Sequence, residues 1–460
     1  MFSQIAARER IDSESLLKVS LEMAARLSTV KRLDSVAEVA QVSDGNHLSI
    51  ANEFGDEQAE GVRYLRGQDI SGDMVLDDRN QVFIPETEYD KLARSHIFQN
   101  DVLITIVGAN TGQTALVDEA PEKLTANCKL GILRPKKSVI HPAYLHACLA
   151  GRYGQTQVMA AKRGGAQMGL ILPDLKTLKI PRFSEIFESK VAVISLRAHR
   201  TRRTVHKCFA EAESVLLQAL GLKNWQAPEP LSYVRSSRDA FAAGRLDAQH
   251  FQPRYAALAG HIQATGNGHL LGDWLLQNRR GKQPDYADDG LPVVNSKHVL
   301  RGEVRLDSDN RRAMHGDDDL LIHTGDVLMN GTGVGTIGRC APYLHTASAI
   351  PDNHVTILSP KSGLDAVYLS VFLNSMAGQL QVEQRLRGSS GQIELYPNDI
   401  AQFHIWIAPP SVQRDVRHAV EQSYELKQRS TQLLDTAKRA VEIAIEKGEK
   451  TALAYLETNA

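Results

Sequence analysis

The strongest constraint on the fold of this chain is an internal duplication. Landmarks of a first copy recur in the same order in a second copy, 224 to 235 residues later. Solenoid repeats are only roughly 20–50 residues long, so the repeated unit is a whole module. The matched landmarks are Arg10-Ile11-Asp12 with Arg245-Leu246-Asp247, Asp101-Val102-Leu103 with Asp326-Val327-Leu328, Asn127 with Asn353, Tyr144-Leu145 with Tyr368-Leu369, Arg163-Gly164 with Arg387-Gly388, and Ile180-Pro181 with Ala408-Pro409.

Each module reads as mixed α and β structure. Short runs rich in Val, Ile and Leu, separated by Gly, Asn and Asp, predict strands of a compact sheet. One helical stretch then follows in each module, at 143–161 and 366–386. Pro173-Asp174 and Pro397-Asn398-Asp399 are expected to form turns that begin the last strand. The predicted strand segments are 62–70, 81–85, 101–107, 113–117 and 130–135, then 291–299, 326–330, 338–343 and 354–360.

A long amphipathic helix is predicted after each module. Apolar residues follow three- and four-residue steps from Phe183 to Leu220, and again from near Ser411. The two helices should pack against each other, and 38 helical residues would span roughly 57 Å, enough to space two modules apart. Prolines in the segment 224–232 allow the chain to turn back. The expected division is 1–30 as an N-terminal segment, 31–182 as the first module, 183–222 as the first helix, 223–268 as linker and start of the second repeat, 269–409 as the second module, and 410–460 as the second helix and tail.

The order of these landmarks resembles a known family. In each copy a turn (Asp44-Gly45, Arg280-Gly281) precedes Asp-Val-Leu, a Gly-rich turn, Leu/Tyr-Pro and a final Pro before a long helix. Over nearly the whole chain this is similar to the specificity subunit of a type I restriction-modification system. The resemblance implies an α+β fold with two pseudo-repeated mixed α/β target recognition domains, separated by two long antiparallel, coiled-coil-like helices.

The resemblance also implies a function and partners. The two domains would bind the parts of a split target in double-stranded DNA. The helices would set their distance and dock two copies of a modification methyltransferase, which a restriction/translocase subunit joins. The chain itself would be a non-catalytic subunit without metal or cofactor. S-adenosylmethionine and ATP are then expected in the partner subunits.

Composition narrows the function classes. Lys plus Arg total 53 against 54 Asp plus Glu, so nucleic-acid binding must come from local basic loops. The four cysteines, Cys128, Cys148, Cys208 and Cys340, lie far apart without zinc-ligand spacing, which suits a reducing cytoplasm. No apolar run approaches the roughly 20 residues of a membrane span, and the N-terminus lacks a signal-peptide pattern, so we expect a cytoplasmic protein that does not contact membranes.

Catalytic motifs are not recognisable. The proline pair Pro409-Pro410 lacks the polar and aromatic flanks of an adenine methyltransferase motif. The turn Gly333–Gly338 is followed by Arg339-Cys340-Ala341-Pro342 and does not fit a dinucleotide fingerprint. A self-sufficient restriction enzyme is therefore disfavoured. A scaffold or adaptor built on a helical coiled coil, with no role in DNA binding, stays open as the alternative.

Candidate DNA-contacting residues cluster on segments expected to be loops. Arg and Lys suit guanine, whereas Asn and Gln suit adenine, and nearby glycines let the backbone approach phosphates. A separate basic run, between Arg197 and Lys207 on the first long helix, is a candidate docking surface for an acidic partner, or simply a solvated face. The candidates are Ser43, Asn46, His47, Arg66, Gln68, Lys162, Arg163 and Gln167 in the first module, and Arg279, Arg280, Lys282, Gln283, Lys297, His298, Arg385, Arg387, Ser389, Ser390 and Gln392 in the second.

Overall fold

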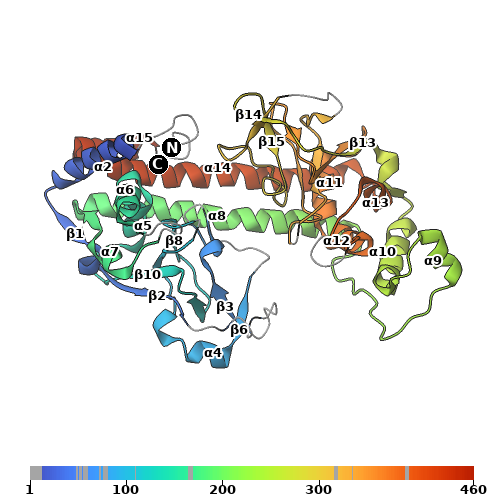
Figure 1. The fold of residues 1–460 in the computed structure, drawn as a ribbon, viewed down its shortest axis with the longest axis horizontal. Coiled ribbons are helices and arrows are strands. Elements are labelled where there is room, and N and C mark those ends of the chain that lie inside the picture. Colours follow the sequence, from blue (N-terminus) through green and yellow to red (C-terminus); the bar gives the residue numbers. More distant parts are fainter. Residues whose placement is uncertain are drawn as a thin grey trace. The chain divides into compact units, whose positions relative to one another are not determined.

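Two units divide the chain in the computed structural model (Figure 1). The first unit contains the described residues of Glu9–Thr204 and Leu426–Ala460, and the second unit contains Val205–Glu425. Each unit therefore joins one module with part of both long helices, α8 (Glu185–Ala219) and α14 (Pro410–Lys447). The structure describes residues 13–47, 50, 54, 61–71, 74–75, 81–108, 110–163, 169–314, 320–333, 335–388 and 393–459.

The first module is built on a four-stranded antiparallel sheet with the order β2-β10-β7-β8. A second sheet, β6-β3-β9, contains a parallel pair between β3 and β9. The bounds are β1 (Leu33–Ser35), β2 (Ala40–Asp44), β3 (Gly61–Leu65), β4 (Ile70–Ser71), β5 (Met74–Val75), β6 (Phe83–Pro85), β7 (Val102–Thr105), β8 (Thr114–Leu116), β9 (Leu124–Ala126), β10 (Leu130–Pro135) and β11 (Lys179–Pro181), with helices α2 (Ser13–Ser28), α3 (Val36–Val39), α4 (Glu86–Asp90), α5 (Pro142–Ala150), α6 (Arg152–Ala161) and α7 (Leu172–Thr177).

The second module repeats this topology. Its main sheet has the order β13-β20-β17-β18, and β15 pairs in parallel with β19 as β3 does with β9. The bounds are β12 (Gly268–Leu270), β13 (Leu275–Arg280), β14 (Tyr286–Ala287), β15 (Leu291–Val294), β16 (Arg312–Ala313), β17 (Val327–Asn330), β18 (Cys340–Pro342), β19 (Ile350–Pro351), β20 (Val355–Pro360) and β21 (His404–Trp406), with helices α9 (Ser237–Ala243), α10 (Pro253–Ala264), α11 (Ala366–Asn374), α12 (Met376–Arg385) and α13 (Pro397–Ala401).

Matched side-chain hydrogen bonds show that the duplication extends to single contacts. The buried hydroxyl of Tyr144 donates to the Pro181 carbonyl at 2.8 Å, and that of Tyr368 donates to the Trp406 carbonyl at 2.8 Å. The predicted mixed α/β fold and the internal repeat are therefore confirmed. The first landmark pair cannot be compared, because residues 10–12 lie outside the described residues.

The prediction of one helical stretch in each module is wrong, because the segment forms two helices, α5 and α6 in the first module and α11 and α12 in the second. The break falls at Gly151 and at Ser375, whose backbones are extended with ψ of 167° and 170°. Three residues later a glycine passes close to the preceding helix. A Cβ at Gly378 would lie 2.2 Å from the Leu373 carbonyl oxygen, and one at Gly154 would lie 2.3 Å from that of Cys148. The predicted turns at Pro173 and Pro397 are also corrected, because they begin the short helices α7 and α13.

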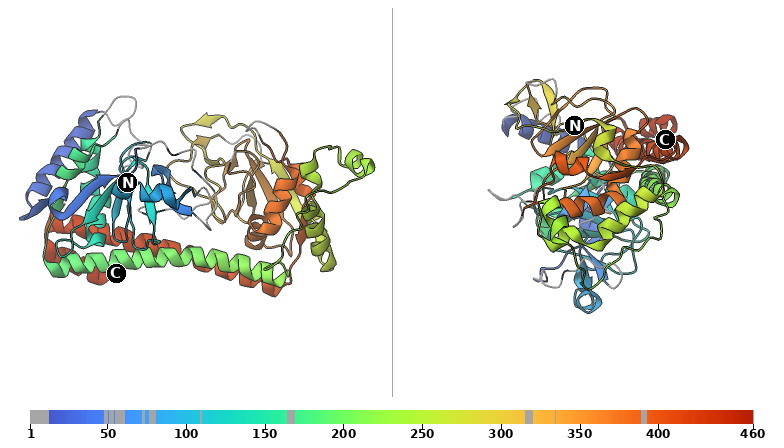
Figure 2. Two further views of the ribbon diagram at one scale, coloured as in Figure 1. Left: turned by 90° about the horizontal axis from the view of Figure 1, so that it is seen from below. Right: turned by 90° about the vertical axis from the view of Figure 1, so that its right-hand side faces the viewer.

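The two long helices are confirmed as continuous elements that run antiparallel. Within the first unit, Ser430 of α14 donates to the Ala198 carbonyl of α8, while the later residue Glu449 accepts from the earlier residue Ser184. Figure 2 shows α8 in green beside α14 in red. The tail is a further helix, α15 (Glu449–Asn459).

Each module packs its helices and one sheet face against these long helices. In the first unit Tyr144, Phe187 and Leu433 share one buried cluster, and in the second unit Tyr368, Leu216 and Val416 share another. At about 25 cal/mol per Å² of apolar surface, such burial is the main force that attaches each module to its helices. The module and the helix ends of one unit therefore form a common core.

Candidate nucleic-acid interface

Two candidate segments of the first module meet at the end of β7. The backbone of Gly67, between Arg66 and Gln68, packs against Thr105 and Lys129. Gly169 pairs with both Val107 and Arg163, which places the Arg163 backbone beside the segment that follows β7. Residues from three separate stretches of sequence therefore meet at one end of the main sheet. We call this place the β7 end.

The second module gathers the equivalent segments at the end of β17. Arg280 donates through Nη2 to the carbonyls of Gly331 at 3.0 Å and Leu395 at 2.7 Å. Asn330 donates to the Ser296 carbonyl at 3.0 Å, which holds the Lys297 turn beside it. Glu394 pairs with Thr332 and Arg387, as Gly169 does with Val107 and Arg163. This β17 end is the counterpart of the β7 end.

Most of the described candidates in the first module hold local contacts. The His47 ring lies 2.7 Å from Asp44 Oδ2, and Arg66 pairs with Asp69 through Nε and Nη2. Asn46 is buried and its amide donates to the Tyr64 hydroxyl, so its side chain points into the module. Gln68 is exposed, whereas burial lowers the pKa of the half-buried Lys162.

Candidates near the start of the second module differ sharply in exposure. Arg279, Lys282 and Gln283 are exposed. Lys297 is exposed and pairs with Asp309 at 2.5 Å. The His298 side chain is only 2% exposed, and burial lowers its pKa, so the ring stays neutral inside the module. Its Nδ1 lies 3.1 Å from the Asn310 amide nitrogen. In this conformation the His298 ring is a structural group.

Arg385 and Arg387 have different surroundings although they are two residues apart. Arg385 donates to the Gln402 carbonyl at 3.0 Å and lies over the Phe403 ring, and burial lowers its pKa to about 10. Arg387 is exposed and pairs with Asp399 through two hydrogen bonds, which raise its pKa. Arg387 is thus the one of the two that faces solvent.

The expectation that all candidates lie on loops is corrected at five positions. Arg385 is the last residue of α12, and Gln68 lies in a short 3-10 helix, Gly67–Asp69. Ser43 belongs to β2, while Arg279 and Arg280 end β13. Gln167, Ser389, Ser390 and Gln392 lie outside the described residues. The role of each candidate in DNA binding stays a prediction.

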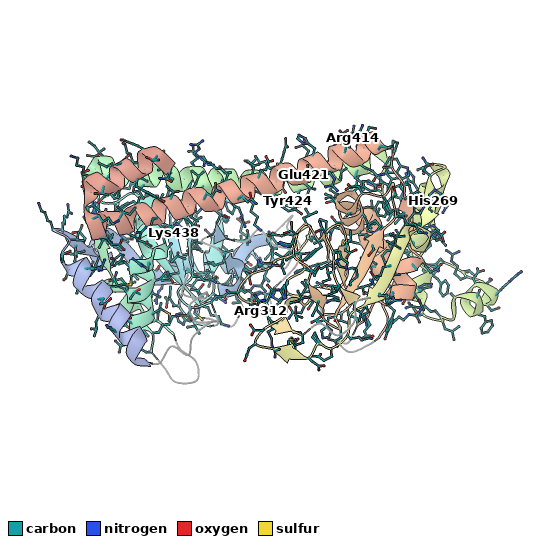
Figure 3. The ribbon with its side chains drawn as sticks, turned by 90° about the horizontal axis from the view of Figure 1, so that it is seen from above. His269, Arg312, Arg414, Glu421, Tyr424 and Lys438 are labelled. Atoms are coloured by element: carbon teal, nitrogen blue, oxygen red, sulfur yellow. The ribbon has the colours of Figure 1, made fainter. Side chains whose placement is uncertain are left out.

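Two arginines and a tyrosine near β16 were not among the residues predicted from the sequence. Arg311 and Arg312 are exposed at β16, and the Arg311 guanidinium lies 3.3 Å from the centre of the Tyr286 ring. Figure 3 shows Arg312 on the side of the second module that faces away from Tyr424 of α14. The adjacent arginines of the segment Asn310–Ala313 were a visible signal, but no counterpart in the first copy drew attention to them.

The basic run on α8 is divided by its contacts. Arg203 pairs with Asp118 and Glu119 of the first module, which holds that module against α8. Arg197, Arg200 and Lys207 are exposed. A partner-docking role for these three residues stays a prediction.

The described residues were compared with the requirements of a metal site and of a membrane-spanning helix. No group of three or more His, Cys, Asp or Glu side chains there is placed to hold a metal ion. None of the helices in the described part of the chain is long and apolar enough to cross a membrane.

Comparison with known proteins gives one significant curated relative and several solved structures. No protein-family model matches the sequence. The chain is 30% identical over 164 residues to the type I restriction enzyme EcoBI specificity subunit of Escherichia coli. That match covers 35% of this chain and 31% of the relative, so it spans about a third of the relative's length.

The solved structures that align over most of the chain are only distantly similar. A type I restriction-modification S subunit from M. genitalium aligns over 93% of this chain and 96% of its own, with 13% identity and a TM-score of 0.37. The HsdS subunit from Thermoanaerobacter tengcongensis aligns over 93% and 96%, with 13% identity and a TM-score of 0.28.

Proposed function

We propose that this chain is the specificity subunit of a type I restriction-modification system and reads a split sequence in double-stranded DNA. The observation that carries the proposal is the convergence of matched polar and basic segments at the β7 end and at the β17 end. Two similar modules with equivalent reading surfaces suit a target in two parts. The curated relative, over the segment that it shares, supports the same function.

Phosphate binding and base reading fall to different residues in this proposal. Arg279, Lys282, Arg311 and Arg312 are exposed cations of one module that suit phosphates, which fix position but carry no sequence information. Side chains held in one orientation suit base edges, since each base pair presents a distinct pattern in the major groove. Affinity should then fall steeply with salt while sequence preference remains.

The chemistry is assigned to partner subunits. The chain is proposed to be non-catalytic, and to direct two copies of a modification methyltransferase and a restriction/translocase subunit to the target. S-adenosylmethionine and ATP would bind to those partners. The exposed cations of α8 at Arg197, Arg200 and Lys207 are offered as part of the methyltransferase docking surface.

The test is selection of duplexes from a random library by the purified chain, alone and with the methyltransferase that we expect to be encoded beside its gene. We expect a single split target, and incorporation of labelled methyl groups only when the partner is present. Methylation by the chain alone would contradict the non-catalytic assignment. Retention of no duplex by chain or complex would favour the alternative of a scaffold.

A further inference from the structure

An arginine–aspartate pair occurs at the same place in both modules. Arg163 donates to Asp174 through Nε at 2.8 Å and through Nη2 at 2.6 Å. Arg387 donates to Asp399 through Nε at 2.9 Å and through Nη2 at 2.7 Å. The same two nitrogens face the carboxylate in both pairs. The duplication has therefore preserved an orientation of the guanidinium as well as a charge.

The backbone around the two pairs is also the same. Arg163 exchanges two backbone hydrogen bonds with Gly169, both of 2.8 Å, and Arg387 exchanges two with Glu394, of 2.9 and 2.8 Å. The aspartates stand in the first turns of α7 and α13, next to the strand ends described above. Each guanidinium is thus fixed at its backbone and at its side chain, at the β7 end and the β17 end.

One edge of each guanidinium remains accessible. The Arg163 side chain is 68% exposed and that of Arg387 is 51% exposed, whereas their aspartates are 13% and 12% exposed. Nη1 makes no hydrogen bond in either residue within the described part of the chain, and Nη2 uses one of its two hydrogens. The outer edge, made of Nη1 and Nη2, can therefore donate two parallel hydrogen bonds.

The chemistry of the pair favours a base over a phosphate. A carboxylate next to the arginine cancels most of the charge that would displace counterions from the DNA backbone. Fixing the plane of the guanidinium instead improves bidentate bonding to two acceptors in a row, because less rotamer freedom is lost on binding. In the major groove the matching acceptor pair is O6 and N7 of guanine.

We propose that Arg163 and Arg387 each read one guanine, in the first and the second half of the target, and that Asp174 and Asp399 are positioning residues that hold them. This inference rests on the proposed function. It adds that each half-target contains at least one guanine whose recognition depends on one arginine. It also gives Asp174 and Asp399 a role in recognition, whereas the sequence predicted only that they lie in turns.

The experiment uses the methyltransferase complex and its selected target, with 7-deazaguanine, which lacks the N7 acceptor, at each guanine in turn. In each half-target, replacement of one guanine by 7-deazaguanine should lower the affinity of the wild-type complex about fivefold or more. The Arg387→Ala complex should lose this sensitivity at the second-half guanine and keep it at the first-half guanine. Arg387→Ala should weaken binding by about 5- to 150-fold, as loss of a bidentate base contact does. The slope of log affinity against log salt should not change.

Positioning is tested separately by Asp399→Asn, which keeps the arginine and its charge. The preference for guanine over 7-deazaguanine in the second half-target should fall. The affinity for the whole DNA target should be kept or should rise, because a negative charge is removed. A merely structural role for Asp399 would lower affinity at both halves. Asp174→Asn should produce the same change in the first half.

Arg32→Ala is the matched control, because Arg32 is 65% exposed and also pairs with an aspartate, Asp34. It should leave affinity and preference unchanged. A fall of about one in the salt slope for Arg387→Ala, with no guanine sensitive to the analogue, would show a phosphate contact and overturn the inference. If the wild-type complex selects no split target, the proposed function itself fails.

Discussion

Arg385 and Arg387 are only two residues apart, but we expect Arg385 to serve stability and Arg387 to serve recognition of DNA. Arg385→Ala removes a hydrogen bond to the Gln402 carbonyl and a contact with the buried Phe403 ring. We expect the free energy of unfolding to fall by about 1–3 kcal/mol, as for loss of a half-buried charged donor. Arg387→Ala removes an exposed pair and should cost about 0–1 kcal/mol. Urea denaturation of the two variants beside wild type measures both, and equal losses would show that the assignment of roles is wrong.

Residue types could be predicted from the sequence, but their exposure could not. Two candidate segments meet at the β7 end and three at the β17 end, through backbone contacts and hydrogen bonds between them. Periodicity carries no signal that His298 is buried beside Asn310, or that Arg280 satisfies two carbonyls. Those outcomes depend on contacts between segments distant in sequence. Arg311 was not predicted, because it has no matching arginine in the first copy.

At the scale of elements, two helical glycines have opposite roles. Gly378 lies in the first turn of α12, where the chain crosses the end of α11, and Gly260 lies in α10 with no atom within 4 Å of its Cβ position. Alanine is a better helix former by about 1 kcal/mol, so Gly260→Ala should stabilise the protein by up to that amount. Gly378→Ala should destabilise it by about 1–3 kcal/mol through the clash with the Leu373 carbonyl. Thermal unfolding followed by circular dichroism compares them, and stabilisation by both would contradict the close crossing.

The strands rich in Val, Ile and Leu were predictable because their burial is nearly continuous. β7 and β17 are buried at every residue. The edge strand β13 was missed, since its sequence Leu275–Arg280 is mostly polar and only its first residue is buried. The break between α5 and α6 was missed although Gly151 and Gly154, both poor helix formers, mark it in the sequence. The tertiary crossing at Gly154 requires the turn. The N-terminal segment contains α2, which contacts α6 as α10 contacts α12.

At the scale of the whole molecule, the sequence predicts that α8 and α14 act as a spacer. Deleting seven residues from each helix at facing positions keeps the apolar stripe nearly in phase, because seven residues are close to two turns. Each helix becomes roughly 10 Å shorter, so the unspecified gap in the DNA target should shrink by about three base pairs. Sequencing of methylated sites in cells that carry the variant measures the gap. An active variant with the original gap would show that the modules are tethered flexibly.

Each long helix belongs partly to both units, which predicts how the protein behaves when its chain is cut. Leu231, Val234, Phe241 and Leu246 are among the most exposed large apolar side chains in the described part of the protein, so a protease such as chymotrypsin should cut between α8 and α10. Either fragment then still belongs to both units, since Leu216 of the first fragment lies in the core of the second unit, and Leu433 of the second fragment lies in that of the first. The nicked protein should run as two bands on a denaturing gel and as one peak on size exclusion. Separately expressed halves should likewise complement each other, as two chains that fold only by sharing their cores.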